Sequence, residues 1–470
     1  MKTELLRDAY YARVAPLFGT ALQAKVAGIA GDAGGLDIAL LLARCGVLRF
    51  ASNSNPALLL RKLREQNPLE DRFVLHPMSD ADVIFCGPGS RHVKLRTPKV
   101  RLIFCPATNV SAQLEFLRAE EPSAENGSSW PEDPFDRTDA LNRSAAVMRN
   151  ILSGNFPEHR VLLMGHSRWP WWMQQADAAV SLKSSQYVPA VPHTSVRRGR
   201  VLMIGCGSIG SAAAVSLAPH VKHLALCDPE KIEIENPVRQ EFAISEIGEH
   251  KAMALARRCA LAGAKTQGFV RTINPDVEPA RFAALLRTVQ PDLVILATGT
   301  SIEFSAAALL RKRGIRHIAA RCYARARYFE IIAVNGKRGP CYGCLRDQLN
   351  LGPSPALTPE QRRRYDPDFR PGELNAEPAS VLETGRCAAV LARIARAMLL
   401  TKKEQPPWLV TTFQQERCCF IGANHAECDR NGNWCYGLDL PGKVATFGPE
   451  DVTHVSAVDA CDVCARRWAS

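Results

Sequence analysis

Apolar and polar residues alternate in blocks along this chain, and the pattern is clearest in its middle third. Residues 201–204 and 224–227 are apolar runs typical of buried strands, and a small-residue helix connects them. Helical periodicity and short apolar runs then take turns as far as residue 400. The predicted helices are 251–262, 280–289, 302–313 and 385–400, and the predicted strands are 266–272, 293–297, 317–320 and 328–334. Such alternation is typical of an α/β fold with a mostly parallel, doubly wound sheet.

The first third carries a weaker copy of this pattern. Residues 25–51 read as strand, glycine-rich turn, helix and strand, and further strands are predicted at 83–86, 100–105 and 160–164. The glycines of this copy, Gly31, Gly34 and Gly35, differ in spacing from those of the middle third, and no acid ends its second strand. We therefore predict two Rossmann-like domains, the first inactive; a coincidental strand–helix–strand unit is the alternative. The expected division is an inactive domain at 1–135, a helical and linker segment at 136–198, an active domain at 199–402 with a crossing loop at 345–379, and a C-terminal segment at 403–470.

A glycine-rich turn follows the first strand of the middle third. Gly205, Gly207 and Gly210 form GxGxxG, with Ser208 at the expected helix start, and Asp228 ends the second strand. In such units the glycines allow a phosphate or ribose to approach the backbone and a helix N-terminus, and the acid can bind ribose hydroxyls. The motif alone is a weak signal, and its usual interpretation is an NAD site.

Cationic and amide residues just beyond the acid change that interpretation. Asn236, Arg239 and Gln240 form NxxRQ, and Lys251 follows in a predicted helix. A dinucleotide needs no fixed cations here, whereas a triphosphate attacked at its α-phosphate does. Arginine offers a planar fork to phosphate and lysine a point charge. We therefore expect ATP, with ordinary surface charges as the alternative.

Two CxxC pairs indicate a metal site. Cys341 and Cys344 form one pair, and Cys461 and Cys464 form the other. Two such pairs can place four thiolates at the corners of a tetrahedron around Zn²⁺. A site with four thiolates has no open position, so the expected role of the zinc is structural.

Composition limits the other classes. The chain has 470 residues, 16 cysteines and a formal net charge of +12. We expect no secretory leader and no membrane span, so the cysteines favour reduced thiols and metal ligands in the cytoplasm. A positive net charge is typical of proteins that bind nucleic acid, but the sequence contains no recognisable nucleic-acid-binding motif. We therefore do not expect nucleic acid as a partner.

In this order, GxGxxG, the acid, NxxRQ, the lysine and the paired CxxC resemble the E1-like, ThiF/MoeB-type enzymes that adenylate ubiquitin-like proteins. The resemblance covers residues 201–400 and the last cysteine pair. It implies that Asp228 binds the ATP ribose and that Asn236, Arg239, Gln240 and Lys251 surround the phosphates. It also implies adenylation of a partner's C-terminal glycine with pyrophosphate release, transfer to an E2-like protein, and an inactive domain fused to an active one. A bacterial conjugation pathway of the type associated with antiviral defence is the expected setting.

The N-terminal stretch YYARVAPLFG is similar to the Y-x-R segment of that family. By this resemblance Arg13 would reach from the first domain into the ATP site of the second. An ordinary surface arginine is the alternative.

The chain departs from the family pattern at two places. Gly299 stands where the family usually has an aspartate that holds Mg²⁺; either Glu303 substitutes or metal binding is weak. The predicted crossing loop lacks a cysteine for a thioester. Cys387 is one candidate because a helix start lowers the pKa of a thiol, but a buried helix residue is the favoured interpretation. Loosely spaced C-terminal cysteines, or direct transfer of the adenylate, are the other options.

Other functions remain open at this point. A sulfur-carrier protein or a ribosomal peptide could be the substrate of the same adenylation chemistry. An NAD-dependent oxidoreductase would bind a nicotinamide cofactor and be indifferent to loss of Arg239. A non-catalytic scaffold would turn over no ATP.

Overall fold

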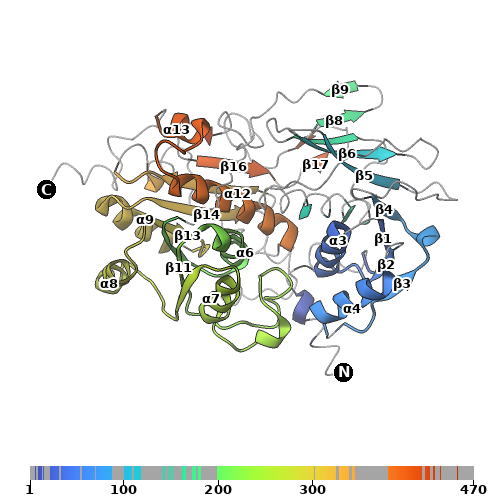
Figure 1. Cartoon of the computed structure of the whole chain (residues 1–470), viewed down its shortest axis with the longest axis horizontal. Helices are drawn as coiled ribbons and strands as arrows, with labels where there is room; N and C mark the ends of the chain where they lie inside the picture. The colour runs from blue at the N-terminus through green and yellow to red at the C-terminus, as the bar shows by residue number, and fades with distance from the viewer. Residues whose placement is uncertain are drawn as a thin grey trace.

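The structure is a computed structural model of the chain. It describes residues 6, 9–12, 14, 22–30, 33–52, 55–68, 70–86, 100–107, 111–117, 141–142, 145, 148–149, 152, 161–165, 172–175, 178–180, 198–300, 302–323, 326, 328–337, 341–343, 379–414, 419–423, 427–428, 434–435 and 452–453. Two large sheets with neighbouring helices make up this part of the chain (Figure 1).

The first sheet has the strand order β3-β2-β1-β4-β5-β6-β7-β8-β9. Its pairs are parallel from β3 to β5 and antiparallel from β5 to β9. The strands are β1 (Val26–Ala30), β2 (Arg49–Ser52), β3 (Val74–His76), β4 (Val83–Cys86), β5 (Val100–Ala107), β6 (Ser111–Leu117), β7 (Val161–Gly165), β8 (Trp172–Gln175) and β9 (Ala178–Val180).

The second sheet repeats this plan with the order β12-β11-β10-β13-β14-β15-β16-β19. It is parallel from β12 to β14 and antiparallel beyond, while β17 (Glu427–Cys428) and β18 (Trp434–Cys435) pair separately. The strands are β10 (Arg200–Ile204), β11 (His223–Cys227), β12 (Lys265–Phe269), β13 (Leu293–Leu296), β14 (His317–Tyr323), β15 (Tyr328–Val334), β16 (Cys419–Ala423) and β19 (Val452–Thr453).

Helices cover both faces of the second sheet. Along β10, Val201 and Met203 pack into the core that contains α6 (Ser208–Leu217), α7 (Lys251–Leu261) and α12 (Val381–Leu399). Leu202 and Ile204 pack into the opposite core, against α8 (Pro279–Val289) and α9 (Ile302–Arg313). Successive strand residues point to opposite faces, so burial on both faces explains the continuous apolar runs. The remaining helices are α3 (Ala33–Arg44) and α4 (Pro56–Gln66) beside the first sheet and α13 (Pro407–Gln414) beyond α12.

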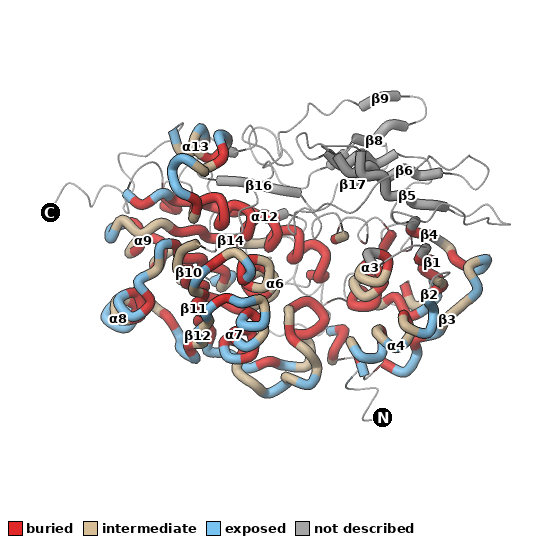
Figure 2. Tube along the Cα trace, viewed as in Figure 1, coloured by how far each residue is buried: buried red, intermediate tan, exposed pale blue. Residues whose placement is uncertain are grey.

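We call the first sheet with its helices the first region and the second sheet with its helices the second region. Helix α12 connects the two regions. Figure 2 shows it buried along almost its whole length. Val381 and Leu382 at its start belong to the core of the first sheet, whereas the residues from Cys387 onward belong to the core of the second. Arg149 also forms a fully buried ion pair with Glu383 in the first turn of this helix. One helix therefore contributes apolar surface to both cores.

The predicted α/β fold with parallel sheets is confirmed, and the bounds of α9 and β15 agree with the sequence pattern. Helix α12 begins at Val381 and not at residue 385, because Ser380 caps it by accepting the N–H of Leu382. Strand β7 agrees with the strand predicted at 160–164, whereas β8 and β9 extend the first sheet further into residues 136–198, which we expected to be a helical and linker segment. Helix α4 and strand β3 were not predicted. Among the described residues, no helix combines the length and apolarity that a bilayer span requires.

Candidate functional site

The glycine-rich turn between β10 and α6 is set by close packing. Gly205 has φ +96°, and a Cβ there would lie 2.4 Å from the carbonyl oxygen of Ala297. A Cβ on Gly210 would lie 2.0 Å from the carbonyl oxygen of Gly205. Gly207 differs, because no atom of the described residues lies within 4 Å of a Cβ built there. Two glycines thus serve the packing of the turn, and the third faces space that a ligand can use.

Asp228 binds this turn through its carboxylate. Its Oδ2 accepts the backbone N–H of Cys206 at 2.7 Å, and its Oδ1 accepts the N–H of Glu230 at 2.8 Å. Burial raises the pKa of Asp228, and the two N–H groups and the charge of Lys251 oppose that rise. The carboxylate therefore lies fixed beside the start of α6, where Gly207 is the N-cap. Carboxylate oxygens keep further lone pairs, so Asp228 can also accept ribose hydroxyls.

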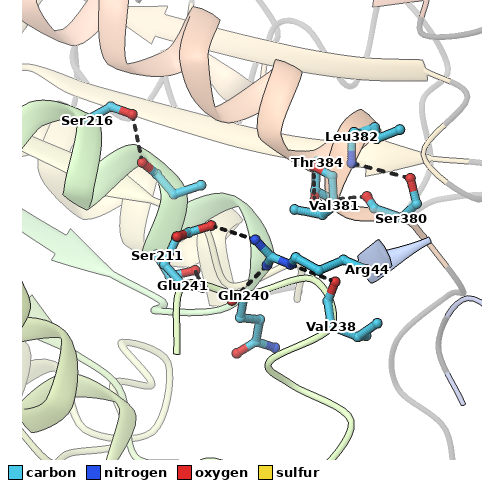
Figure 3. A network of polar contacts seen from close by, with 11 residues as sticks. Arg44, Ser211, Ser216, Val238, Gln240, Glu241, Ser380, Val381, Leu382 and Thr384 are labelled. Atoms are coloured by element: carbon cyan, nitrogen blue, oxygen red, sulfur yellow. Dashed lines mark hydrogen bonds and ion pairs between the residues drawn. The ribbon is translucent and has the colours of Figure 1, made fainter. Parts of the chain in front are cut away.

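The predicted NxxRQ residues form a tight turn over α6. The carbonyl oxygen of Asn236 accepts the N–H groups of Arg239, at 3.0 Å, and Gln240, at 2.8 Å. The side chain of Asn236 accepts the N–H of Glu233 at 3.0 Å, so this amide stabilises its own loop. Ser211 of α6 accepts the N–H of Glu241 at 3.1 Å (Figure 3). Arg239 and Gln240 are therefore held close to the turn that contains Gly207.

Gln240 supplies an independent sign of a ligand. Its side chain is buried, and its Oε1 has no hydrogen-bond partner among the described residues. Figure 3 shows this side chain directed away from the contacts that hold the backbone of the turn. Buried polar atoms are nearly always paired, so an unpaired one beside an open turn fits a site for a polar ligand.

Lys251 is the first residue of α7 and is almost completely buried. Its Nζ pairs with the carboxylate of Glu230, whose side chain is 66% exposed. The charge of Lys251 also acts on Asp228 and on Cys206 of the glycine-rich turn. The lysine thus lies at the same site as the turn and the acid, paired with a partner that can turn to solvent.

Arg13 lies outside the described residues, but its neighbours pack on the NxxRQ turn. Tyr10 and Tyr11 stack edge to face, with ring centroids 4.9 Å apart, and both join Val14 in a small core around Val238. Burial raises the pKa of Tyr10 to about 12, so this hydroxyl stays protonated. The N-terminal segment therefore contacts the same turn that contains Arg239.

Glu303 is not placed as a metal ligand. It is fully buried, accepts the N–H of Gly299 at 2.7 Å and forms an ion pair with Arg321. Arg321 also donates to the carbonyl oxygen of Thr300 at 2.7 Å. Gly299 itself has φ +68°, a conformation that glycine adopts more readily than residues with a Cβ. Because Arg321 already neutralises Glu303, these residues do not favour a protein-held Mg²⁺ at this place, and binding of Mg²⁺ by Glu303 stays a prediction.

The cysteine predictions are tested unevenly. Cys341 is buried in the core between the second sheet and helices α8 and α9. Cys344, Cys461 and Cys464 lie outside the described residues. Within the described part of the chain, no cluster of three metal-ligating side chains occurs. Cys387 lies in the second turn of α12, fully buried, and burial raises the pKa of its thiol well above the usual value. Its interpretation as a buried helix residue holds, and its candidacy as a low-pKa nucleophile is wrong.

Sequence reasoning missed three residues that shape this site. Ser211 holds the NxxRQ turn, Arg321 neutralises Glu303, and Arg44 of α3 contacts the turn from the first region. Arg44 and Arg321 are isolated cations in otherwise ordinary elements, so no local signal distinguishes them. Ser211 follows the last motif glycine, and a hydroxyl at that position was the one available hint.

Comparison with known proteins assigns the second region. A family model described as the ThiF family matches residues 186–399. The ubiquitin-like modifier-activating enzyme ATG7 of Candida glabrata is 33% identical over 85 residues, which are 18% of this chain and 14% of that protein. The match thus spans about a seventh of the curated relative.

Solved structures show a distant likeness. Escherichia coli MccB with MccA-N7isoASN is 15% identical, covers 57% of this chain and 67% of its own, and gives a TM-score of 0.40. The same enzyme with ATP gives 0.39 at 15% identity, over 57% of this chain and 68% of its own. PaaA gives 0.35 at 17% identity, over 50% of this chain and 71% of its own. The sequence match carries the assignment: residues 186–399 match the ThiF family.

Proposed function

We propose that this protein uses ATP to adenylate the C-terminal glycine of a ubiquitin-like protein. One observation carries the proposal: the acid, the open glycine turn, the NxxRQ turn and the buried lysine converge at one end of the second sheet. Asp228 binds the turn beside Gly207, and the charge of Lys251 acts on Asp228. Oε1 of Gln240, which has no hydrogen-bond partner among the described residues, adds a polar group that a bound nucleotide would satisfy.

The two buried cations favour a triphosphate over a nicotinamide dinucleotide. Lys251 and Arg239 are both largely withdrawn from water, where their charges act on phosphate more strongly than at a surface. Glu230 is mostly exposed, so it can leave Lys251 and hydrate when phosphate oxygens replace it. The site would then bind a triphosphate by exchanging one partner of the lysine for another.

The proposed reaction is a displacement at the α-phosphorus. A carboxylate oxygen of the terminal glycine forms a bond to the α-phosphorus. The bond from that phosphorus to the oxygen bridging to the β-phosphorus breaks, and pyrophosphate leaves with the electron pair. Lys251 and Arg239 would stabilise the charge that grows on the phosphate oxygens. Asp228 would orient the ribose. Any Mg²⁺ would arrive on the triphosphate and not on the loop around Gly299.

ATP–pyrophosphate exchange tests the proposal. Purified protein is assayed with candidate acceptors that end in glycine, including ubiquitin-like proteins, sulfur carriers and short ribosomal peptides. Exchange that depends on an acceptor, and that disappears when its last glycine is removed, supports the proposal. Exchange with a sulfur carrier or a peptide alone would correct the acceptor class. Binding of a nicotinamide dinucleotide, or no nucleotide binding at all, would overturn the activity.

The remaining assignments belong to the same proposal. The first sheet is taken as an inactive counterpart of the second, Arg13 as an arginine that reaches the phosphates, and an E2-like protein as the downstream partner. Contact of the Tyr10–Tyr11 segment with Val238 supports the placement of Arg13. Arg13→Ala is expected to lose ATP–pyrophosphate exchange while its stability without ATP stays that of the wild type. Unchanged ATP–pyrophosphate exchange would remove Arg13 from the site.

A structural Zn²⁺ on Cys341, Cys344, Cys461 and Cys464 completes the proposal. Cys341 is buried in the core between the second sheet and helices α8 and α9. This position suits a zinc ligand that ties the C-terminus to that core. Elemental analysis of the purified protein is expected to find one zinc per chain. Cys461→Ser is expected to lose the zinc and to lower the melting temperature. A zinc-free wild-type protein of the same stability would contradict this part.

A further inference from the structure

Arg44 crosses from the first region to the nucleotide-site turn of the second. It is the last residue of α3 and is only 9% exposed. Its guanidinium donates three hydrogen bonds: Nε to the carbonyl oxygen of Val238 at 3.1 Å, Nη2 to that of Gln240 at 2.9 Å, and Nη1 to Oε1 of Glu241 at 3.3 Å (Figure 3). All three acceptors lie within four consecutive residues, 194 to 197 positions away in sequence.

These contacts fix the backbone on both sides of Arg239. The carbonyl oxygens of Val238 and Gln240 belong to the peptide groups before and after Arg239 and Gln240, and one guanidinium binds both. Ser211 of α6 holds the next N–H, that of Glu241, from the other side. The turn is thus held between a helix of the first region and the helix that follows the glycine-rich turn.

A simple surface contact would not have this form. A cation at a helix C-terminus is already stabilised by the carbonyl groups of its own helix. Arg44 instead directs its planar fork at the other region, where it satisfies two buried carbonyl groups and one carboxylate. Hydrogen bonds from a charged donor to buried acceptors are stronger than neutral ones, and the fork fixes their relative orientation. Lysine could supply the charge but not this geometry.

We infer that Arg44 is a positioning residue for phosphate binding. It holds the 236–241 turn in the conformation that presents Arg239 and Gln240, and it does not touch the nucleotide itself. The inference rests on the proposed function, because it assigns the turn to the phosphates. It gives the first region a direct role in the site of the second, separate from that proposed for Arg13.

Comparing two ligands separates positioning from general stability. Asp228, which is proposed to hold the ribose, lies outside the turn, so adenosine should bind Arg44→Ala as it binds the wild type. ATP should bind this variant about ten-fold more weakly, which equals the loss of about 1.4 kcal/mol of binding free energy. Arg44→Lys should restore little of the loss because it lacks the fork. Arg61→Ala, an exposed arginine of α4 in the same region, is the matched control and should change neither affinity.

Hydrogen exchange of the ligand-free protein gives a second reading. The N–H groups of Arg239, Gln240 and Glu241 are bonded within the turn or to Ser211, so they should exchange faster in Arg44→Ala. The strands of the second sheet should keep their protection. If Arg44→Ala is too unstable to purify, Arg44→Lys and Glu241→Gln give the same reading with smaller changes in packing.

The outcomes distinguish this inference from the proposed function. Suppose that the wild type binds ATP, and that Arg44→Ala matches Arg61→Ala in its affinity for ATP, in its affinity for adenosine and in amide hydrogen exchange. The inference then fails and the proposed function stands. Equal weakening of ATP and adenosine would make Arg44 a residue of general stability and also overturn the inference. If the wild type binds no ATP, the proposed function fails, and faster exchange of the turn alone would still show that Arg44 holds it.

Discussion

The two sheets share a plan and differ in chemistry. Both place five parallel strands in the same relative order and continue as antiparallel strands. In the second region Asp228 follows the second strand, and Gly205 and Gly210 shape an open turn. In the first region Ser52 ends the corresponding strand. The same topology therefore occurs with an acid after the second strand in one region and a serine at its end in the other.

One glycine of the first region allows the same close packing of helix on strand as in the second region. A Cβ on Gly35 would lie 2.6 Å from Cγ2 of Ile29, so this glycine allows α3 to pack closely on β1. The equivalent need in the second region is met by Gly210. Close packing of helix on strand is a requirement of the fold, whereas an acid at the strand end is a requirement of the ligand. The comparison separates these two demands on one motif.

The shared helix α12 is expected to give the largest effect. Glu383→Ala removes the carboxylate that neutralises the buried Arg149, which should lower the free energy of unfolding by about 3–5 kcal/mol. Urea unfolding measures this change, and Glu65→Ala, in an exposed pair of α4, should leave stability unchanged. Equal stability of the two variants would show that the Arg149–Glu383 pair does not hold the regions together.

Loss of a cation at the proposed phosphate site should lower the rate of catalysis, whereas loss of an exposed cation far from it should not. Lys251→Ala should lower the rate of ATP–pyrophosphate exchange by about 10²–10³-fold, as removal of a charge-stabilising donor does elsewhere. Lys62→Ala, an exposed lysine of the first region, is the control and should exchange at the wild-type rate. A normal rate in Lys251→Ala would remove the chemical difference between the two regions.

Acid should weaken the second region through His317 of β14. Its Nδ1 lies 2.9 Å from the carbonyl oxygen of Ile315 and must donate, and burial lowers the pKa of this histidine from 6.5 to about 4. The unfolded chain then binds the proton more readily between these values. Stability is therefore full above pH 6.5 and falls as the pH drops toward 4, by at most about 3 kcal/mol.

Hydrogen exchange at pH 7 and pH 5 measures this loss in each region. We expect the strands around β14 to lose protection before those around β1. The variant His317→Asn can keep a donor to Ile315 but cannot titrate, so its protection should depend less on pH. An unchanged pH dependence in this variant would assign the acid sensitivity to another group.

The smallest effect is expected at Cys387. Its thiol is buried in the core shared by α12 and the second sheet, and its raised pKa opposes formation of a thiolate. Cys387→Ala should cost about 1 kcal/mol of stability and leave exchange and any acceptor thioester unchanged. Loss of a thioester in this variant alone would show that α12 opens during the reaction.

The elements of the second region were largely predictable from the sequence. Strands β10 and β13 are buried on both faces, so each is an apolar run, and helix α9 agreed residue for residue. Strands β8 and β9 were not predicted, because the pairing of antiparallel strands depends on residues outside the local pattern. The early start of α12 was missed because a buried ion pair places charged residues where periodicity expects apolar ones.

Local order in the sequence thus determined the glycine turn, the acid, the NxxRQ turn and the order of the second region's elements. Each depends on residues within a few positions of one another or on burial that leaves an apolar pattern. Only the tertiary structure decided that Arg44 binds the NxxRQ turn, that Glu303 pairs with Arg321, and that α12 joins two cores. The sequence around a single charged residue does not indicate which distant residue will become its partner in the folded protein.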